Sequence, residues 1–234
     1  GGGEKEALLQ KGPFSPPPVL RFSSLPQKEP DIMHLVCFGD SICYGYGARP
    51  GEGWVAQTTR MLATLRSPIS VTNAGVSGNT TDDALRRMQW DVERHRPDAV
   101  FVQFGLNDAS FWYRPVGRPM VGFKTYLANM GEIIQRAFRA GAGSVFLATN
   151  HRPASGLDIP GADLYRRNVR DYNEGLRATF AGMRGLVLID MERLILDQFP
   201  DPDTILLPDG VHLNRTGNDF YFTIIGGRIA RFAA

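Results

Sequence analysis

The sequence predicts a single α/β domain, a three-layer α/β/α sandwich with a five-stranded parallel sheet in the middle. Five short apolar runs alternate with longer segments in which apolar residues recur at helical spacing. The third run, residues 99 to 104, is apolar except for Gln103, as expected of a strand buried on both faces of a parallel sheet. A length of 234 residues suits one domain with a full core.

The first 30 residues differ in composition from the rest of the chain. Three glycines open the sequence, and six prolines stand between residues 13 and 30. Proline lacks the N–H that a helix interior needs, so at most a short helical piece, residues 4 to 11, precedes them. We therefore expect an arm or linker over residues 1 to 30 and the folded domain over residues 31 to 234.

The elements of the domain are expected in a regular order. Strands are predicted over residues 34–38, 69–73, 99–104, 144–149 and 186–190. Helices are predicted over residues 54–65, 80–96, 123–140, 165–180, 192–198 and 216–231. Thr80 with Asp83 three residues later is typical of a helix start, and Pro97 and Gly141 are typical of residues that follow a helix end.

Composition excludes some classes of protein. The chain is 43% hydrophobic and 21% charged, and its net charge of +2 indicates neither a nucleic-acid partner nor a charged membrane surface. No apolar run reaches the length of a membrane span, and no compact signal-peptide core is visible at the start. The two cysteines, Cys37 and Cys43, do not suggest a disulfide framework. A cytoplasmic protein is expected, with a processed secreted form as the alternative and the oligomeric state left open.

Four glycine-containing blocks follow the first three predicted strands and precede the last helix. They are CFGDSICYGYG at residues 37 to 47, NAGVSGN at 73 to 79, GLND at 105 to 108 and DGVHLN at 209 to 214. Right-handed crossovers bring the carboxyl ends of parallel strands to one edge of a sheet, where ligands bind. The blocks are therefore expected to meet in one cleft.

The residues in these blocks suit nucleophilic catalysis. Ser41 needs a base to take its proton, and His212 is the candidate, with Asp209 to orient its imidazole ring. Attack on an ester carbonyl creates an oxyanion, which needs preorganised donors. The candidate donors are the backbone N–H groups of Ser41 and Gly75 and the side-chain amide of Asn107.

The order and spacing of the four blocks resemble the GDSL/SGNH family of serine esterases and lipases, from about residue 34 to the C-terminus. The family's named positions match Ser41, Gly75, Asn107 and His212, with Asp209 as the triad acid. The resemblance implies a flavodoxin-like SGNH hydrolase fold, no cofactor and the same assignment of roles. Ile42 and Cys43 differ from the residues that are commoner in the family's first block, but neither has a role in this chemistry.

Each assignment has a simpler alternative. Gly75 and Asn107 are also common turn residues, and Asp209 with His212 could be a metal pair, although no third ligand stands near them in sequence. Cys43 is a rival nucleophile, but no histidine lies beside it and a buried structural thiol is the expected reading. We expect no metal site.

The predicted function is that of a serine esterase acting on carboxylic or O-acyl esters of a small molecule or sugar, through an acyl-enzyme intermediate. Alternatives are an acyltransferase, a lipase or lysophospholipase for longer chains, a phosphodiesterase, and a binding module with a vestigial site. Candidate substrate contacts follow the third and fourth strands: Phe111, Trp112, Tyr113, His151 and Arg152. Bulky aromatic residues would narrow the cleft, which favours short acyl groups.

Overall fold

The computed structural model describes residues 32 to 232, so the expected arm over residues 1 to 30 lies outside the described residues. Five strands form the sheet: β1 (Met33–Gly39), β2 (Ile69–Gly75), β3 (Ala99–Gln103), β4 (Ser144–Ala148) and β5 (Leu186–Ile189). They are parallel throughout, in the order β2-β1-β3-β4-β5. This confirms the predicted α/β fold class and its five-stranded parallel sheet.

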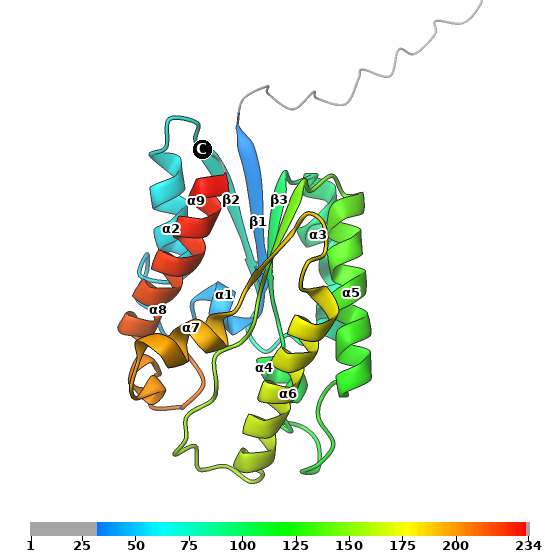
Figure 1. Ribbon diagram of the computed structural model, residues 1–234, viewed down its shortest axis with the longest axis vertical. Helices are drawn as coiled ribbons and strands as arrows, with labels where there is room; N and C mark the ends of the chain where they lie inside the picture. Colours follow the sequence, from blue (N-terminus) through cyan, green and yellow to red (C-terminus); the bar gives the residue numbers. More distant parts are fainter. Residues whose placement is uncertain (1–31, 233–234) are drawn as a thin grey trace, which may run out of the picture. The chain divides into compact units, whose positions relative to one another are not determined.

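Helices cover both faces of this sheet (Figure 1). On one side lie α2 (Trp54–Ala63), α8 (Arg215–Tyr221) and α9 (Gly227–Phe232). On the other side lie α3 (Thr81–Asp91), α5 (Phe123–Arg139) and α6 (Ala162–Phe180). The short helix α7 (Met191–Gln198) follows β5. Each long helix turns one apolar stripe to the sheet, as helical spacing of apolar residues requires.

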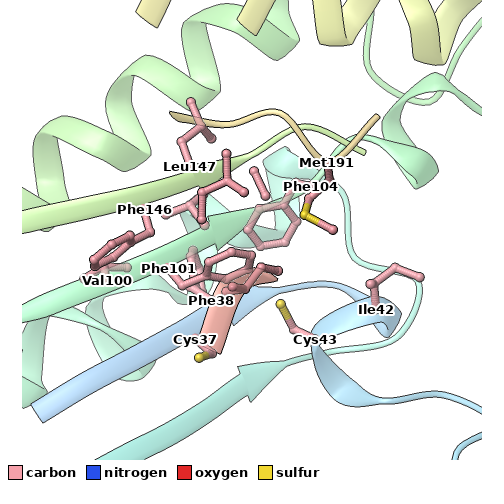
Figure 2. Close-up of a cluster of buried hydrophobic side chains, with 14 of the residues drawn as sticks. Cys37, Phe38, Ile42, Cys43, Val100, Phe101, Phe104, Phe146, Leu147 and Met191 are labelled. Atoms are coloured by element: carbon pink, nitrogen blue, oxygen red, sulfur yellow. The ribbon is translucent and has the colours of Figure 1, made fainter. Parts of the chain in front are cut away.

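The core lies where the three central strands β1, β3 and β4 pack against the two helical layers. Every residue of β3 and β4 is buried, which matches their nearly continuous apolar sequences. Figure 2 shows the aromatic rings of this region, with Phe38 and Phe104 edge to face at 5.2 Å between centroids. Cys37 and Cys43 belong to the same cluster, and both are free thiols.

Two predicted helices differ from the observed ones. The helix expected to reach residue 96 ends at Asp91 and continues as a 3₁₀ turn, Glu93–His95. The last helix is interrupted by a π-helical segment, Phe222–Gly226. Gly226 approaches α2 so closely that a Cβ atom there would lie 3.0 Å from Thr58 Oγ1. This close approach accompanies the local change of helical pitch.

Two short helices were not expected from the sequence. They are α1 (Ser41–Tyr44), directly after β1, and α4 (Leu106–Ala109), directly after β3. Four residues are too few to show a helical period, so periodicity cannot reveal such elements. Both begin at the carboxyl edge of the sheet, and they carry the two sequence blocks that contain Ser41 and Asn107.

Candidate active site

Ser41 is the first residue of α1, just beyond the carboxyl end of β1. Asp40 caps this helix, because its Oδ1 accepts a hydrogen bond from the N–H of Ile42 at 2.9 Å. Gly39 must be glycine, since a Cβ atom there would collide with the Sγ of Cys43. The tight strand-to-helix turn thus places the Ser41 side chain at the edge of the sheet.

His212 links Ser41 to Asp209. Its Nε2 lies 2.9 Å from the Oγ of Ser41, and its Nδ1 lies 2.7 Å from the Oδ2 of Asp209. Because a carboxylate oxygen only accepts, Nδ1 carries the proton and Nε2 is left as the acceptor for the serine hydroxyl. The ring is therefore in the tautomer that a general base for Ser41 requires.

The turn from Asp209 to His212 is held together by its own carboxylate. The Oδ1 of Asp209 accepts hydrogen bonds from the N–H groups of Val211 and His212, both at 2.9 Å. Partial burial alone would raise the pKa of Asp209, but these two bonds and the imidazole of His212 hold it below its ordinary value. Asp209 thus stays ionised at neutral pH and can stabilise an imidazolium ring.

The ring of Tyr46 covers the ring of His212. Their centroids are 4.2 Å apart and their planes are tilted by 34°. Tyr46 is 48% exposed, so one face of the imidazole is shielded while the tyrosine itself borders solvent. The sequence prediction missed this residue, and only its place in the glycine-rich run after Ser41 could have suggested it.

Asn107 lies on α4 near the loop that follows β2. Its Nδ2 donates one hydrogen bond to the carbonyl of Asn79 at 3.0 Å, which leaves its second amide proton for another acceptor. The Ser41 N–H, at the start of α1, has no acceptor among residues 32 to 232. Both groups can therefore act as donors at this edge of the sheet.

Gly75 does not provide the donor that its place in the sequence suggested. Its N–H already donates to the Oδ1 of Asn73 at 2.9 Å. Its Cα instead packs on the backbone of α1, where a Cβ atom would collide with the N of Tyr44. Gly75 is thus a packing glycine, and Asn73, whose Nδ2 donates to the Cys43 carbonyl at 2.9 Å, ties β2 to α1.

Gly78 is the second glycine of the same block and has a different environment. It adopts a φ of +80°, and a Cβ atom built on it would meet nothing within 4 Å. Within the described part of the chain, its N–H donates to no other group. Gly78 directly precedes Asn79, whose carbonyl accepts the hydrogen bond from the Asn107 side chain. The Gly78 N–H is therefore one residue away in sequence from the group that holds the Asn107 amide.

Two buried carboxyl groups, those of Asp40 and Asp108, support the loops around Ser41. Asp108 accepts hydrogen bonds from the N–H and the hydroxyl of Thr81, at 3.0 and 2.5 Å, and so joins α4 to α3. Burial raises the pKa of Asp40 to about 7 and that of Asp108 to about 7. Asp40 and Asp108 therefore belong to the scaffold behind Ser41.

Cys43 does not qualify as the nucleophile. Its side chain is 1% exposed and lies in the core. Burial raises the pKa of its thiol well above the ordinary value, so the reactive thiolate is disfavoured. The expected structural role of this thiol agrees with its packing against Gly39.

The three aromatic residues after α4 differ in their packing and exposure. Phe111 packs against the core, and Trp112 meets the ring of Tyr165 edge to face at 5.7 Å between centroids. Tyr113 is 88% exposed. In the described region, none of the three makes a hydrogen bond or ring contact with Ser41 or His212. The expected role as substrate contacts therefore gains no support from their positions.

His151 and Arg152 are engaged in structural contacts. His151 is buried, with Nδ1 2.8 Å from the Oη of Tyr221 and Nε2 2.7 Å from the carbonyl of Val211. Arg152 pairs through Nε with the buried carboxylate of Glu192 at 2.7 Å. Both ring nitrogens of His151 are therefore occupied, whereas the Arg152 side chain is 44% exposed and, among the described residues, bonds through Nε alone. A substrate contact by Arg152 thus stays a prediction.

Two hollows border the loop that follows α1. One, of about 270 Å³, is lined by Gly47, Arg49, Glu52, Leu213 and Arg215 among others. The other, of about 210 Å³, is lined by Tyr44, Arg49, Gly53 and Asn73 among others. In residues 32 to 232, no group of three or more histidine, cysteine or acidic side chains is arranged to hold a metal ion. No helix of that region is long and apolar enough to cross a membrane.

The chain is similar to known esterases and acylhydrolases. A model of the GDSL-like Lipase/Acylhydrolase family matches residues 37 to 220. The chain is 32% identical over 186 residues to the thioesterase 1/protease 1/lysophospholipase L1 of Escherichia coli, covering 80% of this chain and 78% of that protein. It is 26% identical over 225 residues to an acetylxylan esterase of Xylanibacter ruminicola, covering 88% of this chain and 45% of that protein.

Among solved structures, a lipase/acylhydrolase from Enterococcus faecalis is similar, with a TM-score of 0.67 and 28% identity. That likeness covers 84% of this chain and 95% of the other. The chain spans about half the length of several curated relatives that it matches. The resemblance drawn from the four sequence blocks is thereby confirmed: the chain belongs to the GDSL-like lipase/acylhydrolase family.

Proposed function

We propose that this protein is a serine esterase that hydrolyses carboxylic esters through an acyl-enzyme intermediate. The observation that carries the proposal is the hydrogen-bonded line from Asp209 through His212 to Ser41, with distances of 2.7 and 2.9 Å. A nucleophile, a base in the correct tautomer and an ionised group that orients the base are the parts that acyl transfer requires.

In the first half of the reaction, the Ser41 Oγ attacks the ester carbonyl carbon while His212 Nε2 takes the hydroxyl proton. Asp209 stabilises the imidazolium ring that forms. The tetrahedral intermediate then collapses, the bond to the alcohol oxygen breaks, and Nε2 returns the proton to that oxygen. In the second half, His212 deprotonates a water molecule that attacks the acyl group and releases Ser41.

The oxyanion of the tetrahedral intermediate needs donors that point at it before it forms. We assign this role to the N–H of Ser41, the side-chain amide of Asn107 and the N–H of Gly78. The assignment of Gly78 in place of Gly75 is supported by their hydrogen bonds. The Gly75 N–H is taken by Asn73, whereas the Gly78 N–H has no acceptor among the described residues.

For the substrate, we propose a short acyl group, such as an O-acetyl group on a small molecule or sugar. Tyr44 and Tyr46 are exposed residues that follow Ser41 closely in the chain, and the Tyr46 ring packs on that of His212, so bulky aromatic groups border the triad. The acetylxylan esterase relative supports the same choice.

A second candidate is a thioesterase or lysophospholipase that accepts longer acyl chains. It is favoured by the Escherichia coli relative, whose name includes both activities and which is 32% identical over 186 residues. An acyltransferase would use the same triad with an alcohol in place of water. A binding module without catalysis is disfavoured, because the triad has catalytic distances.

A panel of p-nitrophenyl esters from acetyl to palmitoyl tests the proposal, together with an acyl-thioester substrate. Wild-type turnover is expected to be highest on the short esters and to be lost in Ser41→Ala. Ser70→Ala is the matched control, because this exposed serine at the far end of β2 bonds only the Met33 carbonyl, at 3.3 Å. Equal turnover in wild type and Ser41→Ala would refute the proposal that Ser41 is the nucleophile of an esterase.

A further inference from the structure

We propose that His151 and Tyr221 are positioning residues that anchor the turn carrying Asp209 and His212 to the central strand of the sheet. The inference rests on the proposed function, because it concerns the same triad. It begins with Val211, the residue before His212, whose carbonyl is 2.7 Å from the Nε2 of His151. His151 follows β4 and is 60 positions away in the sequence.

The hydrogen bonds of this network have only one consistent direction. A carbonyl oxygen can only accept, so Nε2 of His151 carries the proton and donates it to Val211. The other ring nitrogen, Nδ1, must then accept, and it does so from the hydroxyl of Tyr221 at 2.8 Å. Each ring nitrogen of His151 thus has the partner that its protonation state requires, and the opposite tautomer would not fit these partners.

The network ends in the centre of the sheet. The Nε2 of Gln103, the last residue of β3, donates to the Oη of Tyr221 at 3.3 Å and to the carbonyl of Thr149 at 3.0 Å. Gln103, Tyr221 and His151 are all buried. The polar Gln103, the one exception in its apolar strand, therefore connects the centre of the sheet, through Tyr221 and His151, to the catalytic turn.

The two peptide groups that flank Val211 are both held by hydrogen bonds. Its N–H donates to the Oδ1 of Asp209 at 2.9 Å, and its carbonyl accepts from His151. The preceding Gly210, at a φ of +70°, gives the turn conformational freedom on that side. Without the His151 bond, the Val211–His212 peptide would be held only through the His212 N–H, which donates to Asp209, and the imidazole would be aligned less firmly with Ser41.

His151 is suited to this role because it does not change charge under ordinary conditions. Burial lowers its pKa to about 4, so it stays neutral and keeps one tautomer. A protonated ring would lose the acceptor for Tyr221. At pH values well above 4, the neutral ring instead preserves the direction of every bond in the network.

The inference is tested with His151→Leu, His151→Gln, Tyr221→Phe and the control Tyr172→Phe. In His151→Leu, kcat for p-nitrophenyl acetate is expected to fall by about 10- to 100-fold, while KM changes less than about twofold. His151→Gln retains an amide donor for Val211 and is expected to recover most of this loss. Tyr172→Phe removes another buried hydroxyl bond, that to the Val121 carbonyl, and is expected to leave kcat unchanged.

A measurement without substrate separates this inference from the proposed function. The proton between His212 Nδ1 and Asp209 is expected to give a far-downfield NMR signal in wild type and His151→Gln, and to broaden or vanish in folded His151→Leu. If the signal and kcat of folded His151→Leu equal those of wild type, the anchoring role is wrong. If the signal behaves as expected but no ester is turned over, the proposed function fails and the anchoring role stands.

Discussion

The Nε2 of His212 lies 2.9 Å from the Oγ of Ser41, although 171 positions separate the two residues in the chain. Ser41 is held by the turn from β1 into α1, and His212 by a turn that precedes α8. Two local structures that lie far apart in the sequence thus meet at one edge of the sheet. This contact leads to predictions about the nucleophile, the base, the oxyanion, the scaffold and the substrate.

Labelling will identify the nucleophile. A fluorophosphonate is expected to modify wild-type protein once, at Ser41, because His212 activates only this hydroxyl. Ser41→Ala should stay folded and unlabelled, with kcat lower by on the order of 10⁶-fold. Peptide mapping by mass spectrometry makes the measurement, and Ser70→Ala, which should label normally, is the control. Modification mapped to Cys43 would overturn the assignment.

The pH dependence of kcat/KM reports the base. We expect kcat/KM to fall as the pH is lowered, because a protonated His212 cannot accept the Ser41 proton. Hydrogen bonds hold the pKa of Asp209 below its ordinary value, so Asp209 stays ionised and does not produce this fall. A flat profile from pH 5 to pH 8 would argue against a histidine base.

The acid and the base should differ in the cost of their removal. Asp209→Asn is expected to lower kcat by about 10⁴-fold, because the residue orients the ring without taking the proton. His212→Ala is expected to cost on the order of 10⁶-fold, as loss of the base does in other serine hydrolases. Steady-state assays on one short ester give both values. Equal losses would mean that Asp209 does more than orient His212.

Asn107→Ala tests the oxyanion donor. The expected result is a kcat lower by ~100- to 1,000-fold, equivalent to roughly 2.7–4 kcal/mol, with KM little changed. Its amide matters chiefly when negative charge develops on the substrate oxygen. Asn129→Ala is a matched control on α5, because that amide binds only Thr81 and Asp82. A rise in KM alone would make Asn107 a substrate-binding residue.

The burial of His151 predicts a pH-dependent stability. Its pKa falls from 6.5 to about 4 in the folded protein, so between these values the unfolded chain binds a proton that the folded one does not. The stability that the buried neutral His151 contributes is fully present above pH 6.5 and is lost as the pH falls toward 4. The free energy of unfolding, measured in urea, is expected to decrease from pH 7 to pH 5 in wild type. In His151→Gln this decrease should be smaller by about 2 kcal/mol.

Asp40 and Asp108 act in the opposite direction, since their raised pKa values favour folding at lower pH. Both carboxyl groups are present in wild type and in His151→Gln, so their effects cancel in the comparison. An equal pH dependence in the two proteins would show that His151 is not held neutral by the fold.

Acyl length separates the two candidate substrate classes. For a short-chain esterase, kcat/KM should decrease from butyryl to octanoyl p-nitrophenyl esters, because bulky side chains such as Tyr46, which packs on His212, leave less room for a longer chain. A groove that buried the chain would add about 0.8 kcal/mol per methylene, or about fourfold in kcat/KM for each. A steady rise from butyryl to octanoyl would replace the short-chain proposal with a thioesterase or lysophospholipase.

The sequence by itself determined the fold class and the order of the elements. Alternating apolar runs and helical periods are local properties, and they survive in the observed β1 to β5 and the long helices. The turn residues of the four blocks are also local, so the meeting of Ser41, Asp209 and His212 could be expected once the sheet was parallel. The helices of four residues, α1 and α4, were too short to leave a periodic signal.

Only the tertiary structure decided which polar atoms find partners. Gly75 and Gly78 stand three residues apart in one block, yet the Gly75 N–H donates to the side chain of Asn73, which also bonds the distant Cys43 carbonyl, while the Gly78 N–H donates to no described group. His151 follows a strand at the active edge, as a substrate contact would, but folding buries it against Tyr221 and Val211. Hydrogen bonds between residues far apart in sequence depend on distance and direction in space, and burial then makes each unsatisfied group costly, so composition and spacing cannot specify them.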